Sequence, residues 1–167
     1  IKKSFQKQQF TMGKNVIEFE KNFSKIWNSR YSVAVSNGTV ALDLALKSIS
    51  IRSGDEIIVP AVSYISTASS VSYQGAIPVF VDICPKVFSI DPSKIQKAIT
   101  NKTKAIIYID YGGIPADFKA ITKIARKNNI PLILDGAQTL GSKIDRKSIG
   151  HNGLISTVSF HMAKIIT

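Results

Sequence analysis

Short apolar segments alternate with helix-like segments along most of the chain, and this alternation limits the folds that the chain can adopt. The apolar segments are almost unbroken, which is typical of strands buried on both faces of a parallel sheet. The predicted strands are residues 31–36, 56–60, 77–83, 104–110, 131–135 and 157–161. The predicted helices are residues 15–28, 39–49, 65–73, 93–99 and 116–128. The pattern therefore predicts an α/β fold, a three-layer sandwich with a mostly parallel sheet between two layers of helices.

The first helical segment lies outside this alternation. Phe19, Phe23 and Trp27 have helical spacing, and Asn15 is the expected N-cap. We therefore expect residues 1–30 to form an N-terminal helical arm and residues 31–167 to form one larger domain. Hydrophobic residues make up 44% of the chain, which is enough to give that domain a core of its own.

The formal net charge of +11 raises the question of nucleic-acid binding. The basic residues are scattered over predicted helix faces, however, and no zinc-ligand spacing or basic-aromatic stripe accompanies them. We therefore expect a solvated basic surface that favours phosphorylated ligands, with no nucleic-acid partner and no metal site. The sequence has no apolar stretch of about 18 residues, and its single cysteine, Cys84, cannot form an internal disulfide. We expect a cytoplasmic protein without a membrane span.

The first strand end carries the segment SNGT, residues 36–39, which runs directly into a predicted helix. In parallel sheets, ligands bind beyond the carboxyl ends of the strands, so these positions are the first candidates for a site. Gly38 lets the backbone approach a ligand closely, and the free N–H groups of the helix start favour an anion such as phosphate. An ordinary capped turn is the alternative. Neither the P-loop nor the dinucleotide-binding glycine pattern is present.

Later strand ends add an aromatic ring, a carboxylate and an amine. Tyr64 can stack on a planar ring or simply pack. Asp135 ends a buried strand and needs a cation or hydrogen-bond donors there, with Gln138 one turn further on; a capping role is the alternative. Ser159 and Lys164 follow the last strand, and a partly desolvated lysine becomes an amine nucleophile. A frayed terminus is the alternative for Lys164.

These groups match the parts of one cofactor, pyridoxal 5'-phosphate (PLP). A lysine that binds a cofactor through its amine needs an aldehyde, and an aspartate on the pyridine nitrogen accompanies that lysine in PLP enzymes. The SNGT segment with Ser159 suits the phosphate, Tyr64 the ring, Asp135 the ring nitrogen, and Lys164 the aldehyde. Each signal is weak alone, but all of them point to the same ligand.

Six segments in order along the chain resemble one family. They are FTMGKNVIEFEKNFS, VSNGTVALDLAL, GDEIIVPAVSYISTASSV, GAIPVFVDI, LDGAQTLGS and SFHMAK. The sequence resembles the DegT/StrS family of PLP-dependent nucleotide-sugar aminotransferases, which have fold type I of the aspartate aminotransferase superfamily. The resemblance implies that Lys164 holds PLP covalently and moves protons, and that Asp135 pairs with the ring nitrogen. It also implies roles for the remaining site residues: Gln138 near the ring hydroxyl, Tyr64 on the ring face, and Gly38, Thr39 and Ser159 at the phosphate.

The resemblance further implies a longer, dimeric enzyme. Residues 31–167 would be an incomplete PLP-binding large domain, truncated on its C-terminal side and without the small C-terminal domain. Family members are homodimers whose sites take residues from the neighbouring subunit. One departure lies beside the lysine, where residues 165–167 replace a run that usually contains asparagine.

The expected reaction moves an amino group, with glutamate as donor, to the keto sugar of a nucleoside-diphosphate sugar. Such products serve amino-sugar biosynthesis, including surface polysaccharides. A related branch dehydrates sugar nucleotides but replaces the lysine with histidine, so Lys164 favours transamination and His161 does not fill that position. A truncated, noncatalytic paralogue or fragment would keep the same fold without a complete site. A generic Rossmann-like nucleotide binder is disfavoured because its glycine pattern is missing.

Overall fold

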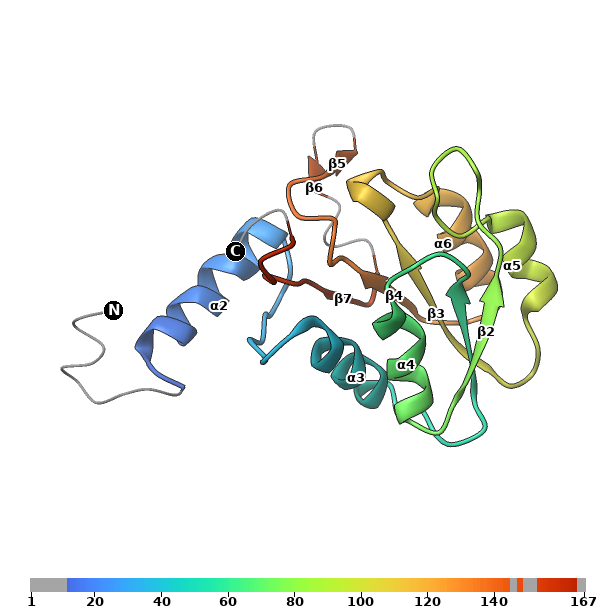
Figure 1. The fold of residues 1–167 in the computed structure, drawn as a ribbon, viewed down its shortest axis with the longest axis horizontal. Helices are drawn as coiled ribbons and strands as arrows, with labels where there is room; N and C mark the ends of the chain where they lie inside the picture. The colour runs from blue at the N-terminus through green and yellow to red at the C-terminus, as the bar shows by residue number, and fades with distance from the viewer. Residues whose placement is uncertain (1–11, 145–146, 149–152, 165–167) are drawn as a thin grey trace. The chain divides into compact units, whose positions relative to one another are not determined.

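A computed structural model describes residues 12–144, 147–148 and 153–164 (Figure 1). The described residues fall into two compact units that divide between Ala34 and Val35. Within the described residues, no helix is long and apolar enough to cross a membrane.

The first unit consists mainly of helix α2, Lys14–Trp27. Phe19, Phe23 and Trp27 stack along it, with ring centroids 5.7 and 5.4 Å apart. Gly13 is the N-cap, because its extended backbone precedes the helix and its carbonyl accepts from the Val16 N–H. The prediction that Asn15 caps the helix is therefore wrong, since Asn15 already lies in the first turn.

Residues 31–36 do not form the predicted strand. The backbone there pairs with no strand among the described residues, and the Ala34 N–H donates instead to the Glu20 carboxylate at 2.8 Å. Val33 is exposed, unlike a residue in a buried strand. A strand exists only through hydrogen bonds to a neighbour, so an apolar sequence alone was not sufficient here.

The second unit is built on a five-stranded parallel sheet with the order β2-β1-β3-β4-β7 (Figure 1). The strands are β1 Glu56–Pro60, β2 Ile77–Val81, β3 Thr103–Ile109, β4 Leu132–Asp135 and β7 Ile155–Thr157. Asp135 at the end of β4 lies opposite Ile109 on one side and Thr157 on the other. This register brings the carboxyl ends of β3, β4 and β7 to the same edge of the sheet.

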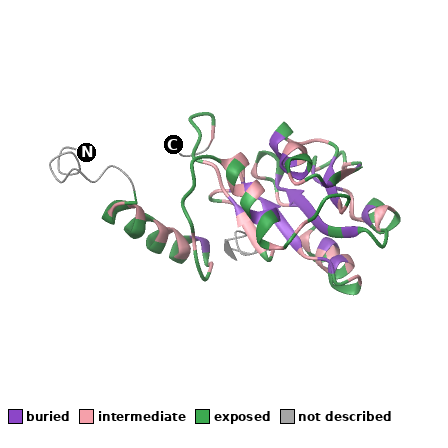
Figure 2. Ribbon diagram, turned by 90° about the horizontal axis from the view of Figure 1, so that it is seen from below, coloured by how far each residue is buried: buried purple, intermediate pink, exposed green. Residues whose placement is uncertain are grey.

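Two helices cover each face of the sheet, which confirms the three-layer α/β architecture. Helices α3, Gly38–Ser48, and α4, Ile65–Tyr73, pack through Leu42, Leu46 and Val71 on one face. Helices α5, Pro92–Ala98, and α6, Phe118–Lys127, pack through Ile95 and Ile121 on the other. Successive residues of the central strands β1, β3 and β4 point to opposite faces, and most of them are buried under both layers, as the purple strands in Figure 2 show.

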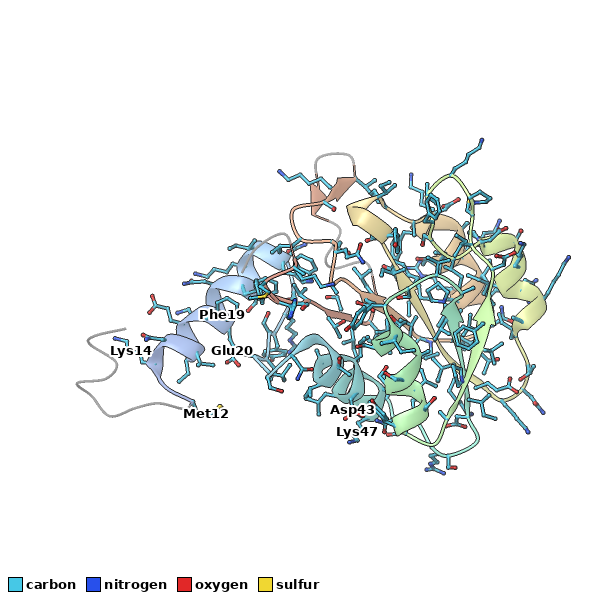
Figure 3. All side chains as sticks on the ribbon, in the orientation of Figure 1. Met12, Lys14, Phe19, Glu20, Asp43 and Lys47 are labelled. Atoms are coloured by element: carbon cyan, nitrogen blue, oxygen red, sulfur yellow. The ribbon has the colours of Figure 1, made fainter. Side chains whose placement is uncertain are left out.

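Polar contacts hold α3 against α4 at the surface. Asp43 of α3 accepts a hydrogen bond from the Gln74 side chain at the end of α4. Asp43 also pairs with Lys47 one turn further along α3, at 3.0 Å (Figure 3). The Asp43–Gln74 bond connects the two helices, whose N-terminal ends lie at the carboxyl edge of the sheet, whereas the Asp43–Lys47 pair lies within α3.

Apart from residues 31–36, the predicted elements agree with the structure within two residues, except the last strand. That strand was predicted at residues 157–161, but β7 ends at Thr157, whose carbonyl accepts from the Gly136 N–H. The ladder stops because its neighbour β4 ends at Asp135. Three short elements were not predicted: the 3-10 helix Tyr111–Gly113, β5 Lys143–Ile144 and β6 Lys147–Ser148, of which the last two form an antiparallel pair.

Candidate active site

The N-terminus of α3 and the segment after β7 approach each other closely. The Asn37 side chain caps α3 by accepting from the Val40 N–H at 2.9 Å. A Cβ atom at Gly38 would lie 3.2 Å from the Ser159 Cβ, which is tighter than an ordinary contact. Among the described residues, the Gly38 and Thr39 N–H groups have no hydrogen-bond partner. Gly38, Thr39 and Ser159 therefore form a positively polarised surface that suits an anion.

Thr39 also links this surface to α4. Its hydroxyl lies 2.6 Å from the Ser66 hydroxyl, in the first turn of α4. Ser66 is buried, so the bond fixes the Thr39 side chain from the protein side. The first turn of α4 thus supports the start of α3.

Asp135 is a buried carboxylate, with 3% of its surface exposed. Its Oδ2 accepts from the Thr67 hydroxyl at 2.7 Å, and its Oδ1 accepts from the Ala137 N–H at 3.3 Å. Burial raises the pKa of Asp135, and the bonds from Thr67 and Ala137 and the charge of Lys164 partly offset that rise. A carboxylate in this position gains from a cationic ligand group that replaces the missing water.

Lys164 and Tyr64 come together from opposite ends of the unit. The Lys164 Nζ lies 5.6 Å from the centroid of the Tyr64 ring. A turn in which the Lys164 N–H donates to the His161 carbonyl, at 2.7 Å, brings the chain back toward the sheet. Tyr64 is 64% exposed, so its ring face is open to a ligand. The amine, the aromatic face and the Asp135 carboxylate therefore belong to one site.

Gln138 faces the loop that follows β3. Its Oε1 accepts from the Gly112 N–H at 2.7 Å. A Cβ atom at Gly113 would lie 3.1 Å from the Gln138 carbonyl oxygen, so the two loops pack tightly. Gln138 thus joins the loops after β3 and β4, and its contact with a ligand stays a prediction.

Four residues that the sequence did not single out contribute to this edge of the sheet. Ser63, Ser66 and Thr67 surround the start of α4, and the only signal for them was the hydroxyl-rich run SYISTASS. Asp110 directly follows β3, and Asp135 is the last residue of β4. Both are carboxylates at the end of a buried strand, so the pattern that singled out Asp135 also indicates Asp110.

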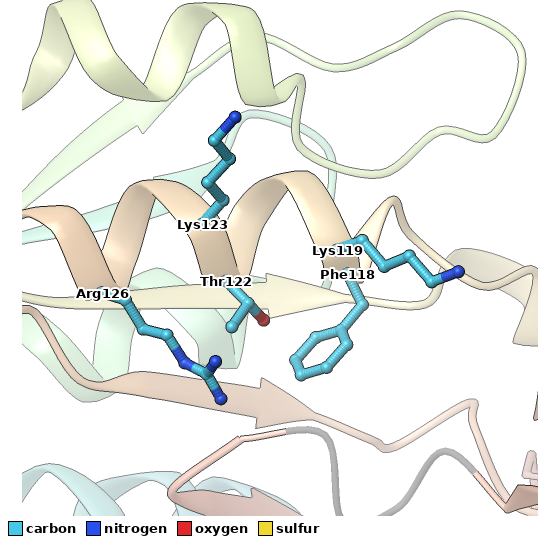
Figure 4. A pocket seen from close by; sticks show the side chains of 5 residues that line it. All are labelled: Phe118, Lys119, Thr122, Lys123 and Arg126. Carbon is cyan, nitrogen blue, oxygen red and sulfur yellow. The ribbon is translucent and has the colours of Figure 1, made fainter.

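A surface hollow of about 440 Å³ lies elsewhere, on α6 (Figure 4). It is lined by Phe118, Lys119, Thr122, Lys123 and Arg126 and contains none of the predicted site residues. The five described residues that line it all come from α6. The strand-end cluster, not this hollow, is the candidate active site.

Together the strand-end groups suit a flat ligand with distinct ends. The start of α3 offers donors to an anion, Tyr64 offers a ring face, and Asp135 offers a negative charge to a cation. The Lys164 amine lies beside the ring face, where it can react with a carbonyl carbon or move a proton.

Known proteins are similar to this chain in sequence and in fold. The model of the DegT/DnrJ/EryC1/StrS aminotransferase family matches residues 1–167. GDP-perosamine synthase of Caulobacter vibrioides is 41% identical over 157 residues, which cover 94% of this chain and 42% of that protein. The PLP form of a putative sugar aminotransferase from Streptococcus pneumoniae superposes with a TM-score of 0.90 at 31% identity, over 94% of this chain and 44% of that one.

A third similar protein is named for a different activity. A histidine-to-asparagine variant of GDP-4-keto-6-deoxymannose-3-dehydratase with bound GDP-perosamine superposes with a TM-score of 0.93 at 33% identity, covering 99% of this chain and 45% of that one. The chain spans less than half the length of the curated relatives it matches. The family match over residues 1–167, the parallel sheet and the similarity to these solved structures agree with one another. The chain belongs to the DegT/DnrJ/EryC1/StrS aminotransferase family.

Proposed function

We propose that this chain is part of a PLP-dependent aminotransferase that acts on a nucleoside-diphosphate keto sugar. The observation that carries the proposal is the convergence of Lys164, Tyr64 and the buried Asp135 at one edge of the sheet. Family membership and the activity for which the perosamine synthase is named support it. A second line of support is the match between each site residue and one part of the cofactor.

The residues present fit PLP. The Gly38 and Thr39 N–H groups and the Ser159 hydroxyl would hold the phosphate, and Gly38 lacks the Cβ that would crowd Ser159. Tyr64 would stack on the ring, and Asp135, buried and in need of a cation, would bind the ring nitrogen. Gln138 is the nearby candidate for the ring hydroxyl. Lys164 supplies the amine that such a cofactor requires.

Each protein group has a defined task in the reaction. PLP, when bound, supplies an electron sink for the carbon that loses or gains the amino group. Asp135, kept as a carboxylate, would hold the ring nitrogen in its protonated form. The Lys164 Nζ would accept a proton from the substrate as general base and donate it again as general acid. The N-terminus of α3 anchors the phosphate, so the reacting end stays beside Lys164.

The finer assignments extend the family resemblance of the sequence. We propose glutamate as the amino donor and a keto sugar of a nucleoside diphosphate as the acceptor, in amino-sugar biosynthesis for a surface polysaccharide. Residues 31–167 would be the first part of the large domain of a longer, cytoplasmic enzyme that works as a homodimer, with residues 1–30 as an arm. The similar dehydratase makes sugar-nucleotide dehydration the second candidate, and Lys164 at the site favours transamination over it.

The test uses the complete enzyme that contains this chain, loaded with PLP and reduced with borohydride. We expect peptide mapping to find the cofactor on Lys164. We also expect Lys164→Ala to reduce amino transfer from glutamate to keto sugar nucleotides to background. Lys119→Ala, on the exposed face of α6, is the matched control and should retain activity. Full turnover by Lys164→Ala would refute the assignment, and loss of water from the sugar without amino transfer would establish the dehydratase.

A further inference from the structure

Two hydroxyl groups form a chain that ends on Asp135. The Thr67 Oγ1 donates to the Asp135 Oδ2 at 2.7 Å, and the Ser63 Oγ lies 2.6 Å from the Thr67 Oγ1. Thr67 is almost fully buried, with 1% of its surface exposed. Its hydroxyl therefore has no access to bulk water and depends on these two partners.

Proton counting fixes the direction of this chain. An ionised carboxylate can only accept, and a threonine hydroxyl has one proton, which must point to Asp135. The Thr67 oxygen can then only accept from Ser63, so Ser63 is the donor in the second bond. Both hydroxyl dipoles consequently point toward the carboxylate when Asp135 is charged.

Asp135 needs this support because burial favours its neutral form. Burial raises the pKa of Asp135, whereas donors to the charged form lower it again, and Thr67 has the largest such effect. The bond from the Ala137 N–H is long, at 3.3 Å. The Thr67 hydroxyl is thus the strongest uncharged donor to Asp135 among the described residues.

The charged neighbours cannot replace the hydroxyl chain. Lys164 also lowers the pKa of Asp135, but its amine is the group that reacts, so its charge changes. Asp110 follows Ile109, which pairs with Asp135 across the sheet, and as an anion it offers no stabilisation to a second carboxylate. The Thr67 hydroxyl is neutral and takes no part in the reaction, so its effect on the pKa of Asp135 stays the same throughout.

We propose that Thr67, supported by Ser63, is a positioning residue that holds Asp135 as a carboxylate directed at the ring nitrogen of the bound cofactor. This inference rests on the proposed function for its role in the reaction. The same turn of α4 places Tyr64 and Ser66, so the aromatic face, the carboxylate and the start of α3 are set by one stretch of backbone. A shift of that turn would move all three together.

The test compares Thr67→Val, which removes the hydroxyl at constant shape, with Thr67→Ser, which retains it. Thr103→Val is the matched control, because Thr103 is a buried threonine whose hydroxyl accepts from the Thr100 N–H at the other end of β3. In the complete enzyme, we expect Thr67→Val to weaken PLP binding by about tenfold to a hundredfold, the range typical of side chains that support a ligand-contacting group. The nitrogen-15 NMR shift of the bound ring should move toward the unprotonated form. Thr67→Ser and Thr103→Val should resemble the wild type in PLP affinity and in the nitrogen-15 shift.

A second measurement needs no cofactor. Carbon-13 NMR of the Asp135 carboxyl in the cofactor-free enzyme should show a higher pKa in Thr67→Val than in the wild type, and a smaller rise in Ser63→Ala. If Thr67→Val is folded and both the Asp135 titration and the ring-nitrogen shift are unchanged, the inference is wrong. If the wild type binds no PLP, the proposed function fails, and the cofactor-free titration still decides whether Thr67 controls Asp135.

Discussion

Asp110 and Asp135 are two buried aspartates at the ends of neighbouring strands, yet their surroundings differ. Both are nearly inaccessible, with 2% and 3% of their surfaces exposed, and burial raises the pKa of each. Asp110 accepts from the Ala116 N–H at 2.9 Å and from the Thr139 hydroxyl at 3.4 Å, and these groups fold the loop after β3. Asp135 instead interacts with the cation Lys164 and lies in the site that includes the open Tyr64 ring.

The comparison separates a carboxylate that holds its own loop from one that we propose to hold a ligand. A raised pKa and deep burial are common to both, so neither property identifies a site by itself. The difference lies in the groups that surround each carboxylate. Among the described residues, Asp110 accepts hydrogen bonds from its own loop and from the turn after β4. Asp135 also lies near the Lys164 cation, which lowers its pKa.

The largest expected effect comes from Asp135→Asn in the complete enzyme. The amide keeps the shape but cannot hold a protonated ring nitrogen, so we expect turnover to fall by about a hundredfold to a thousandfold. Stability of the cofactor-free protein should change little or rise, because a costly buried charge is removed. Steady-state kinetics and urea unfolding measure the two effects. Wild-type turnover in this variant would show that Asp135 and Asp110 have the same, structural role.

The reverse pattern is expected for Asp110→Ala. Removal of this acceptor leaves the buried Ala116 N–H and the Thr139 hydroxyl unpaired, which should lower the free energy of unfolding by about 2–3 kcal/mol. PLP affinity, measured well below the unfolding transition, should remain close to that of the wild type. Asp117→Ala is the control for the loop, since Asp117 is exposed and caps α6, and its loss should cost about 1 kcal/mol. A large loss of PLP binding in Asp110→Ala would place Asp110 in the site.

The smallest expected effect is in the pH dependence of stability. Both carboxyls have a pKa above the ordinary 3.8 when folded, so the folded state binds more protons than the unfolded state just above that pH. Stability of the cofactor-free protein should therefore fall as the pH rises from 3.8 through the raised values. Bound PLP, with its cationic ring nitrogen, should remove the loss of stability that Asp135 causes. The loss of stability that Asp110 causes should remain. Thermal unfolding of the wild type, Asp110→Asn and Asp135→Asn across this range, with and without PLP, checks the division. If PLP also removed the pH dependence that Asp110 causes, the distinction between the two carboxyls would be contradicted.

The sequence predicted the layers of the fold and the strand ends that form the site. Gly38 and Ser159, and likewise Tyr64 and Lys164, are far apart in the chain and lie together in the structure. This was predictable because parallel strands place their carboxyl ends at one edge. The strand predicted at residues 31–36 was wrong, because a strand depends on a partner that the pattern of its own residues does not reveal.

The supporting residues were not predictable from local patterns. Thr67 and Asp135 are 68 positions apart, and nothing in the hydroxyl-rich run at residues 63–70 distinguishes Thr67 from its neighbours. Asp110 and Asp135 follow the same pattern in the sequence, and only their three-dimensional surroundings separate them. Side-chain contacts of this kind depend on register and helix rotation, which apolar periodicity specifies only coarsely.

The close approach of Gly38 to Ser159 has a consequence for how the protein matures. The two residues join the first and last elements of the second unit, a contact of high sequence separation of the kind that forms slowly. The anion-binding surface is therefore complete only after the intervening strands and helices have assembled. A ligand that binds only the finished arrangement adds to its stability by mass action. Binding of the phosphate group would then require that the second unit is folded, and would stabilise its folded state.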